Sequence, residues 1–168
     1  MSHINEILER IAHIQVLIEV TGAPRPNVLA AEPYQPSNVT SNYCPFFVNE
    51  FHPQTGDIPI SSGQQYRTED VWMMLCVRRF EAATNLKLGE QETFLWTDAV
   101  YAAFAQRVKL SDPANDNVPG HSHEGLSFVL DSHIKGWDSI KYVYADLEFL
   151  ALKFVLEVNE MFVTAINA

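Results

Sequence analysis

The feature that most limits how this chain can fold is the stretch from Gln64 to Phe80, which contains neither glycine nor proline. After a polar start it becomes the apolar run Val71-Trp72-Met73-Met74-Leu75-Cys76-Val77. Apolar residues at both sets of alternate positions predict a strand that is covered on both faces. A helix is the alternative for such a run, but its β-branched and aromatic residues favour the strand.

A second long strand is predicted near the C-terminus. Alternate residues there are apolar and would face the core: Leu150, Leu152, Phe154, Leu156 and Val158. The same segment also fits a helix whose apolar face would be Leu147, Leu150, Ala151, Phe154 and Val158. The two-residue alternation runs longer than the helical pattern, so we expect a strand.

Two helices are predicted from apolar residues at helical spacing. The first runs from Ile4 to Ile18, with Ser2 as its N-cap, and stops near Gly22 because prolines follow. The second lies within residues 89–110, where Glu90 suits a helix N-terminus. Its expected buried stripe is Phe94, Tyr101, Phe104 and Val108.

Shorter apolar runs predict further strands at residues 28–31, 43–51, 126–134 and 137–144. Pro45 implies an edge position or a bulge for the second of these. Glycine, proline and serine gather from His52 to Gly63, which predicts a long exposed hairpin tip. Residues 111–125 have no apolar periodicity and are expected to form a mobile loop.

The order of these elements predicts an α+β fold, with a mixed, mainly antiparallel sheet packed by two helices on one face. At 168 residues and 47% hydrophobic, the chain is long enough to form one core, so residues 1–168 are expected to be a single domain.

The net charge, the apolar runs and the N-terminal sequence indicate which partners and which cellular compartment to expect. A formal charge of −10 opposes tight binding to nucleic acid or to an anionic membrane. No apolar run is long enough to span a bilayer, and residues 1–6 lack the features of a signal peptide. The two cysteines, Cys44 and Cys76, each lie in an apolar run and are expected to be buried free thiols in a reducing cytoplasm.

The motifs that would indicate common enzymes are missing. The chain has no nucleophile elbow, phosphate-binding loop, dinucleotide fingerprint or metalloprotease helix motif. The nearest approach to a metal site is His121-Ser122-His123-Glu124, which a solvated loop explains better because nothing in sequence holds the ligands rigid. Asp131 and His133 could add ligands or act as an acid/base pair, but polar residues at a strand end are more often surface. We therefore expect a non-enzymatic protein without a cofactor or metal.

The succession of elements resembles a tailed-bacteriophage tail terminator or tail-completion protein. The resemblance is carried by the first helix, the long hairpin, the strand that begins Gln65-Tyr66-Arg67-Thr68-Glu69-Asp70-Val71-Trp72, the second helix, and the closing strand Leu147 to Val158. It implies a non-enzymatic virion protein that forms a six-fold ring on the tail tube, stops tube growth and joins the head connector. DNA would only pass through, and assembly would take place in the host cytoplasm.

The surface expected to contact other subunits combines the hairpin tip with two tryptophans: His52, Gln54, Thr55, Asp57, Ile58, Ile60, Gln64, Trp72 and Trp137. Residues 24–43 and 111–125 are long for so compact a family, which leaves a neighbouring neck role open, as a head-completion protein or connector. A small metal-dependent enzyme using His121, His123 and Glu124, and a host-type adaptor domain, are the alternatives from other classes.

Overall fold

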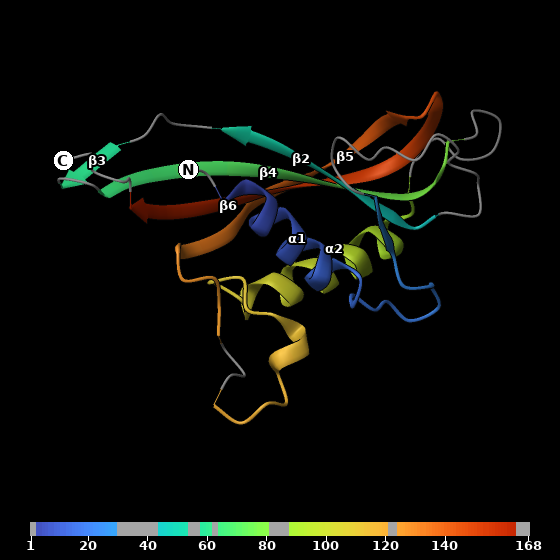
Figure 1. The fold of residues 1–168 in the computed structure, drawn as a ribbon. Helices are drawn as coiled ribbons and strands as arrows, with labels where there is room; N and C mark the ends of the chain where they lie inside the picture. The colour runs from blue at the N-terminus through green and yellow to red at the C-terminus, as the bar shows by residue number, and fades with distance from the viewer. Residues whose placement is uncertain are drawn as a thin grey trace.

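The computed structural model describes residues 3–29, 44–53, 58–61, 64–80, 88–120 and 124–163. Its strands form a mixed sheet in the order β1-β2-β4-β6-β5, and β3 pairs with β4. The fold class predicted from sequence, α+β with a mainly antiparallel sheet and helices against it, is confirmed (Figure 1). The elements are α1 (Ile4–Gln15), β1 (Asn27–Leu29), β2 (Phe46–Pro53), β3 (Ile58–Ser61), β4 (Gln64–Arg79), α2 (Glu90–Ala105), β5 (Val129–Tyr144) and β6 (Leu147–Val163).

The two long strands predicted from sequence lie side by side at the centre of the sheet. β4 has 16 residues and β6 has 17, and they pair antiparallel over nearly their whole length, with Met73 opposite Phe154. The helical alternatives for both segments are therefore wrong. Among the strands that the structure describes, only β1 and β2 pair in parallel.

Both helices cover one face of the sheet and bury the larger core there (Figure 1). The five residues of β6 predicted to face inward are at most 4% exposed and all belong to this core. They pack with the alternate residues Val71, Met73, Leu75 and Val77 of β4 and with α1 and α2 residues such as Ile11 and Trp96. The register of the closing strand is thus as predicted.

A second, smaller cluster lies on the opposite side of the sheet. The rings of Phe46 and Phe149 meet edge to face, with centroids 5.0 Å apart, and Met74 and Ala151 are buried beside them. This cluster explains why β4 carries apolar residues on both faces. Cys76 is buried within it and Cys44 is half-buried at its margin, and both are free thiols.

Both helices differ in detail from the prediction. α1 begins after His3, which occupies the N-cap position, so Ser2 is not the cap, and Ser2 itself lies outside the described residues. The helix ends at Gln15: the Val16 amide still bonds to Ala12, but those of Leu17 and Ile18 bond only three residues back, to Ile14 and Gln15. Ile18 is nevertheless buried.

The predicted buried stripe of α2 is wrong at two positions. Phe94 is 51% exposed, and Val108 is 48% exposed and lies beyond the end of the helix. The buried face is instead formed by Trp96, Thr97, Val100 and Phe104, at the usual helical steps of three and four residues. α2 carries apolar or small residues around much of its circumference, so its composition alone did not identify the face that meets the sheet.

Three predictions about strands need correction. Pro45 lies immediately before β2, where its carbonyl accepts a hydrogen bond from the Asn27 amide, and it marks neither an edge nor a bulge. The predicted tip from His52 to Gly63 contains the end of β2 and all of β3. The two strands predicted at residues 126–144 form one strand, β5, because the pairing shifts register between Ile134 and Gly136 and so absorbs the intervening Lys135.

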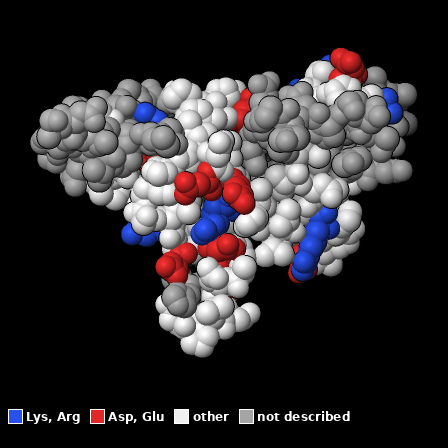
Figure 2. Space-filling model, in the orientation of Figure 1, with Lys and Arg blue, Asp and Glu red and all other residues white. Residues whose placement is uncertain are grey.

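Residues 111–125 are not irregular throughout. A 3₁₀ turn at Pro113–Asn115 is capped by the Asp112 carboxylate, and Arg107 forms an ion pair with Asp116. Arg10 of α1 donates to the carbonyl of Leu110 and lies near Asp112. These contacts fasten the segment to α1 and to the residues that follow α2, and Figure 2 shows basic and acidic side chains interleaved on this side of the molecule.

Candidate functional site

Three side chains of different strands meet on the face of the sheet that faces away from the helices. His52 of β2 stacks on the Trp72 indole, with ring centroids 3.6 Å apart. The ammonium nitrogen of Lys153, from β6, lies 3.8 Å from the centroid of the Trp72 ring. The half-buried indole is thus held by a stacking and a cation–π contact, which makes it a rigid feature of a surface.

Hydrogen bonds link the group of His52, Trp72 and Lys153 through Glu50 of β2 to Tyr142 of β5. The Tyr142 hydroxyl donates to Glu50 Oε1 at 2.8 Å, and Glu50 Oε2 lies 3.2 Å from Nε2 of His52. Burial of the Tyr142 ring, followed by its bond to the Glu50 carboxylate, raises the pKa of the hydroxyl well above its usual range. Tyr142 therefore stays protonated and acts as a fixed donor.

A charged cluster borders Trp72 on the other side. Nζ of Lys135 lies 3.0 Å from Asp70 and 3.4 Å from Glu157. Although burial lowers the pKa of this lysine, the two carboxylates outweigh that effect and raise it. Between this cluster and Trp72 lies a depression of about 440 Å³, bordered also by Asp138, Lys153 and Val155. Because acidic and basic side chains both border this depression, it suits a protein partner better than a single small ion as its ligand.

The structure brings some of the predicted contact residues together. His52 and Trp72 touch, and Trp137 borders the same depression. Trp137, however, pairs with Phe154 and packs beside the helix-side core. Ile58 and Ile60 belong to β3 and Gln64 begins β4, whereas Gln54, Thr55 and Asp57 lie outside the described residues.

The sheet continues beyond the helices as an arm. β3 and the adjoining ends of β4 and β6 extend past the start of α1 (Figure 1). β3 lies beside β4 in line with β2: Pro53 is opposite Glu69, and Ile58 is opposite Tyr66. We call β3 with Gln64–Thr68 and residues 160–163 the arm. It contains the predicted contact residues Ile58, Ile60 and Gln64.

The alternative prediction, a metal site at His121, His123 and Glu124, falls mostly outside the described residues. His121 and His123 lie outside the described residues, and Glu124 is exposed. Within the ranges that the structure describes, no three His, Cys, Asp or Glu side chains are grouped so that they could hold a metal ion. Asp131 and His133 lie on β5, where Asn159 donates to the Asp131 carboxylate at 2.5 Å.

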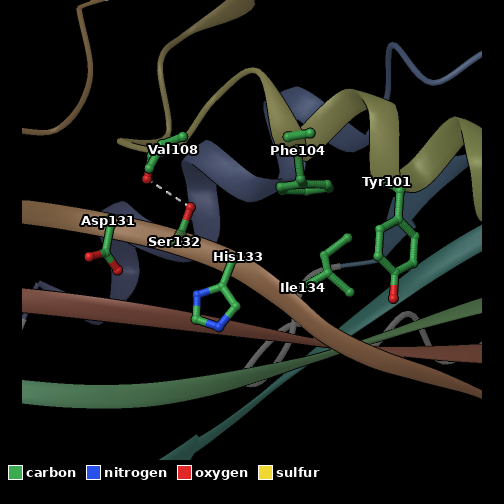
Figure 3. Close-up of a pocket in the computed structure, with 8 residues that line it drawn as sticks. Tyr101, Phe104, Val108, Asp131, Ser132, His133 and Ile134 are labelled. Carbon is green, nitrogen blue, oxygen red and sulfur yellow. Dashed lines mark hydrogen bonds between the residues drawn. The ribbon is translucent and has the colours of Figure 1, made fainter.

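A second hollow, of about 370 Å³, lies between the C-terminal half of α2 and the start of β5 (Figure 3). Ser132 lines it, and its hydroxyl donates to the Val108 carbonyl at 2.9 Å. Apart from Ser132, Asp131 and His133, the lining is apolar, and it includes Tyr101, Phe104, Val108 and Ile134. We call it the α2–β5 hollow.

Sequence reasoning missed the exposed apolar residues of α2. Phe94 and Leu95 are 51% and 44% exposed, near the N-terminus of the helix. The spacing of Trp96, Val100 and Phe104 was the signal that would have placed the buried face and left Phe94 outside it. Lys153 was predicted to point away from the core, which is correct, but its contact with Trp72 depends on strand pairing that no single segment reveals.

Comparisons with protein-family models and with curated proteins give no match to this chain. Among the described residues, neither helix has the length and hydrophobicity that a bilayer crossing requires.

Proposed function

We propose that this protein is a non-enzymatic phage structural protein that forms a ring on the end of the tail tube, ends tube growth and joins the tail to the head connector. The proposal rests on the resemblance in element order and on one structural observation, the arm. An arm that extends past the helical layer presents strand edges that a neighbouring chain can pair with.

The arm suits a closed ring because neighbouring subunits in a ring meet through two different patches. One subunit can extend its arm over the body of the next, and rotation about the ring axis repeats that contact until the ring closes. The face around Trp72, which neither described helix covers, provides a rigid aromatic and charged surface for a further partner, such as the tube protein. Aromatic residues in such positions are frequent anchors of protein interfaces.

The charge of the chain agrees with this role. With 21 acidic and 11 basic side chains, the protein carries a formal net charge of −10, which opposes binding to DNA. A ring through which DNA only passes gains from that repulsion, since bound phosphates would slow transit. A neighbouring neck role, as a head-completion protein or connector, would draw on the same features.

The direct test is to add the purified protein to tail tubes polymerised from the tube protein of the same phage. Electron microscopy should show a ring of density at one end of each tube, and the capped tubes should stop growing when more tube protein is supplied. Tubes that keep growing from both ends at saturating concentrations of the protein would contradict tail termination. Rings found on connectors instead of tubes would assign the neck role.

A further inference from the structure

Helix α1 and the turn that follows it pack on the sheet through four isoleucines at helical steps. Ile7, Ile11, Ile14 and Ile18 are each at most 3% exposed and belong to the helix-side core. Ile4, one turn before them, is half-buried. If α1 slid along its axis by one turn, about 5.4 Å, the four places would be refilled by Ile4, Ile7, Ile11 and Ile14. Apolar packing alone therefore distinguishes poorly between these two positions of the helix.

One polar pair breaks the isoleucine repeat. Gln15, the last residue of α1, is fully buried, and Asn49 of β2 is only 3% exposed. Nε2 of Gln15 donates to Oδ1 of Asn49 at 2.7 Å, and Nδ2 of Asn49 donates to Oε1 of Gln15 at 2.8 Å. Within Ile4–Gln15, Gln15 is the one polar residue that the structure shows as buried. The helix is thus tied to one place on β2 by two reciprocal hydrogen bonds.

A slip of α1 by one turn would break this pair without replacing it. Ile11 or Ala12 would come to the place of Gln15, and neither side chain can donate or accept a hydrogen bond. The Asn49 amide would then lie buried against apolar side chains. An unsatisfied buried amide disfavours such a state by roughly tenfold or more. The amide pair therefore discriminates between positions of α1 that the isoleucines treat alike.

Two other contacts hold α1 less specifically. The Glu160 carboxylate accepts from the backbone amide of His3, and the backbone amide of another residue could take that place. Arg10 donates to the Leu110 carbonyl, but its side chain is 21% exposed, so water can replace that bond if the helix moves. Gln15 and Asn49 have almost no access to water, so a slip leaves their loss uncompensated.

We propose that the Gln15–Asn49 pair is a register lock, which selects the position of α1 along the sheet while the isoleucines supply most of the stabilisation. The inference does not depend on the proposed function. Buried polar residues act in this way in coiled coils, where an apolar repeat alone permits several alignments of the helices. By holding α1 in place, the lock also keeps the His3 amide beside Glu160, at the base of the arm.

The test replaces the pair with apolar side chains of similar shape. Gln15→Met and Asn49→Leu, made singly, each leave one buried amide without its partner, so each should lower the urea midpoint of unfolding. The double variant contains no orphaned amide and should recover most of that loss. Comparing the parent, the two single variants and the double variant as a double-mutant cycle isolates the coupling between the two residues.

The decisive measurement is the isoleucine methyl spectrum of the double variant, because a pair that only stabilised the protein would leave it unchanged. With the isoleucine methyl groups isotopically labelled, the parent should give one resonance for each isoleucine of α1. The double variant should give extra or broadened resonances, since α1 would occupy more than one position on the sheet. Hydrogen exchange of the α1 amides should also become at least about tenfold faster than in the parent.

Thr97→Val is the matched control. Thr97 is a buried polar residue of α2, but its hydroxyl donates to the Thr93 carbonyl of the same helix and not to the sheet. This variant should keep a single set of isoleucine resonances. Gln15→Asn combined with Asn49→Gln retains an amide pair and should keep a single set as well.

Three results would overturn the proposal. A double apolar variant with one parent-like set of resonances would show that the isoleucines fix the position of α1 by themselves. A double apolar variant that fails to fold would show that the pair supplies stability and not register. An exchanged amide pair that gives several sets of resonances would show that the reciprocal hydrogen bonds do not select the position.

Discussion

The Glu160 carboxylate, near the end of β6, accepts a hydrogen bond of 3.2 Å from the backbone amide of His3, at the N-cap of α1. His3 makes no side-chain cap to the helix, so a residue 157 positions along the chain takes part of that role. The His3 ring stacks on Phe128 with centroids 3.9 Å apart, which fixes the start of the helix against the residue that precedes β5. The start of α1 is thereby joined to β6 where the arm leaves the body.

Replacing Glu160 with alanine should lower the free energy of unfolding by about 1–3 kcal/mol, since the His3 amide and the helix terminus lose their acceptor. Urea unfolding followed by circular dichroism measures the change. Glu148→Ala is the control, because Glu148 is 47% exposed and pairs only with the half-exposed Lys141 in the contacts resolved for it. If the variant is as stable as the parent, the free-energy cost of burying the Glu160 carboxylate equals the stabilisation from its hydrogen bond to the helix N-terminus, and the prediction is wrong.

Adjacent positions of β6 should respond very differently to truncation. Phe154 is fully buried beneath the helices, so Phe154→Ala should destabilise the protein by about 3–5 kcal/mol. Lys153 lies on the other face over Trp72, so Lys153→Ala should cost no more than about 1 kcal/mol. Equal, small losses at both positions would contradict the register of the closing strand.

How much could be predicted from sequence differs between the strands and α2. In β6 the two-residue alternation is long enough to fix both the strand and its inward face, because one register buries Phe154 and the other would bury Lys153. In α2 nearly any face is apolar enough to meet the sheet, so Phe94 was assigned to the core and Trp96 was not. Tertiary packing, which selects Trp96 and Phe104, is decided by the shape of the sheet.

The side chains around Trp72 show a second limit of prediction from the sequence. Trp72 and His52 were both predicted as contact residues, but their stacking follows from the pairing of β2 with β4, in which Glu50 lies opposite Trp72. That pairing depends on where β2 starts and ends, and turn-rich sequence on either side obscures both points. β3 was missed for the same reason, since Pro59 and Ser61 are typical of turns.

Alkaline pH should destabilise the protein through Cys44. Burial raises the pKa of this thiol from 9.0 to about 11, so the folded state keeps the proton over a range in which the unfolded state releases it. The unfolded state is thereby favoured as pH rises, and stability should fall between pH 9 and pH 11. Urea midpoints measured across this range should decline less steeply for Cys44→Ser than for the parent; equal slopes would contradict the assignment, since Lys135 and Tyr142 contribute alike in both.

Deleting residues 55–61 should remove β3 and shorten the arm while leaving both helices and the remaining sheet folded. β3 pairs only with the first residues of β4 in the described part of the sheet, whereas the helix-side core draws on β4 from Val71 onward. We therefore expect a helical signal and an unfolding midpoint close to those of the parent, together with loss of ring formation or of tube capping. Deletion of residues 117–120, an exposed turn beyond the Arg107–Asp116 ion pair, is the matched control and should preserve both activities. If the arm-deleted protein still forms rings and caps tubes, the arm is not the ring contact, and the surface around Trp72 becomes the place to search, because its aromatic and charged side chains stay in position without β3.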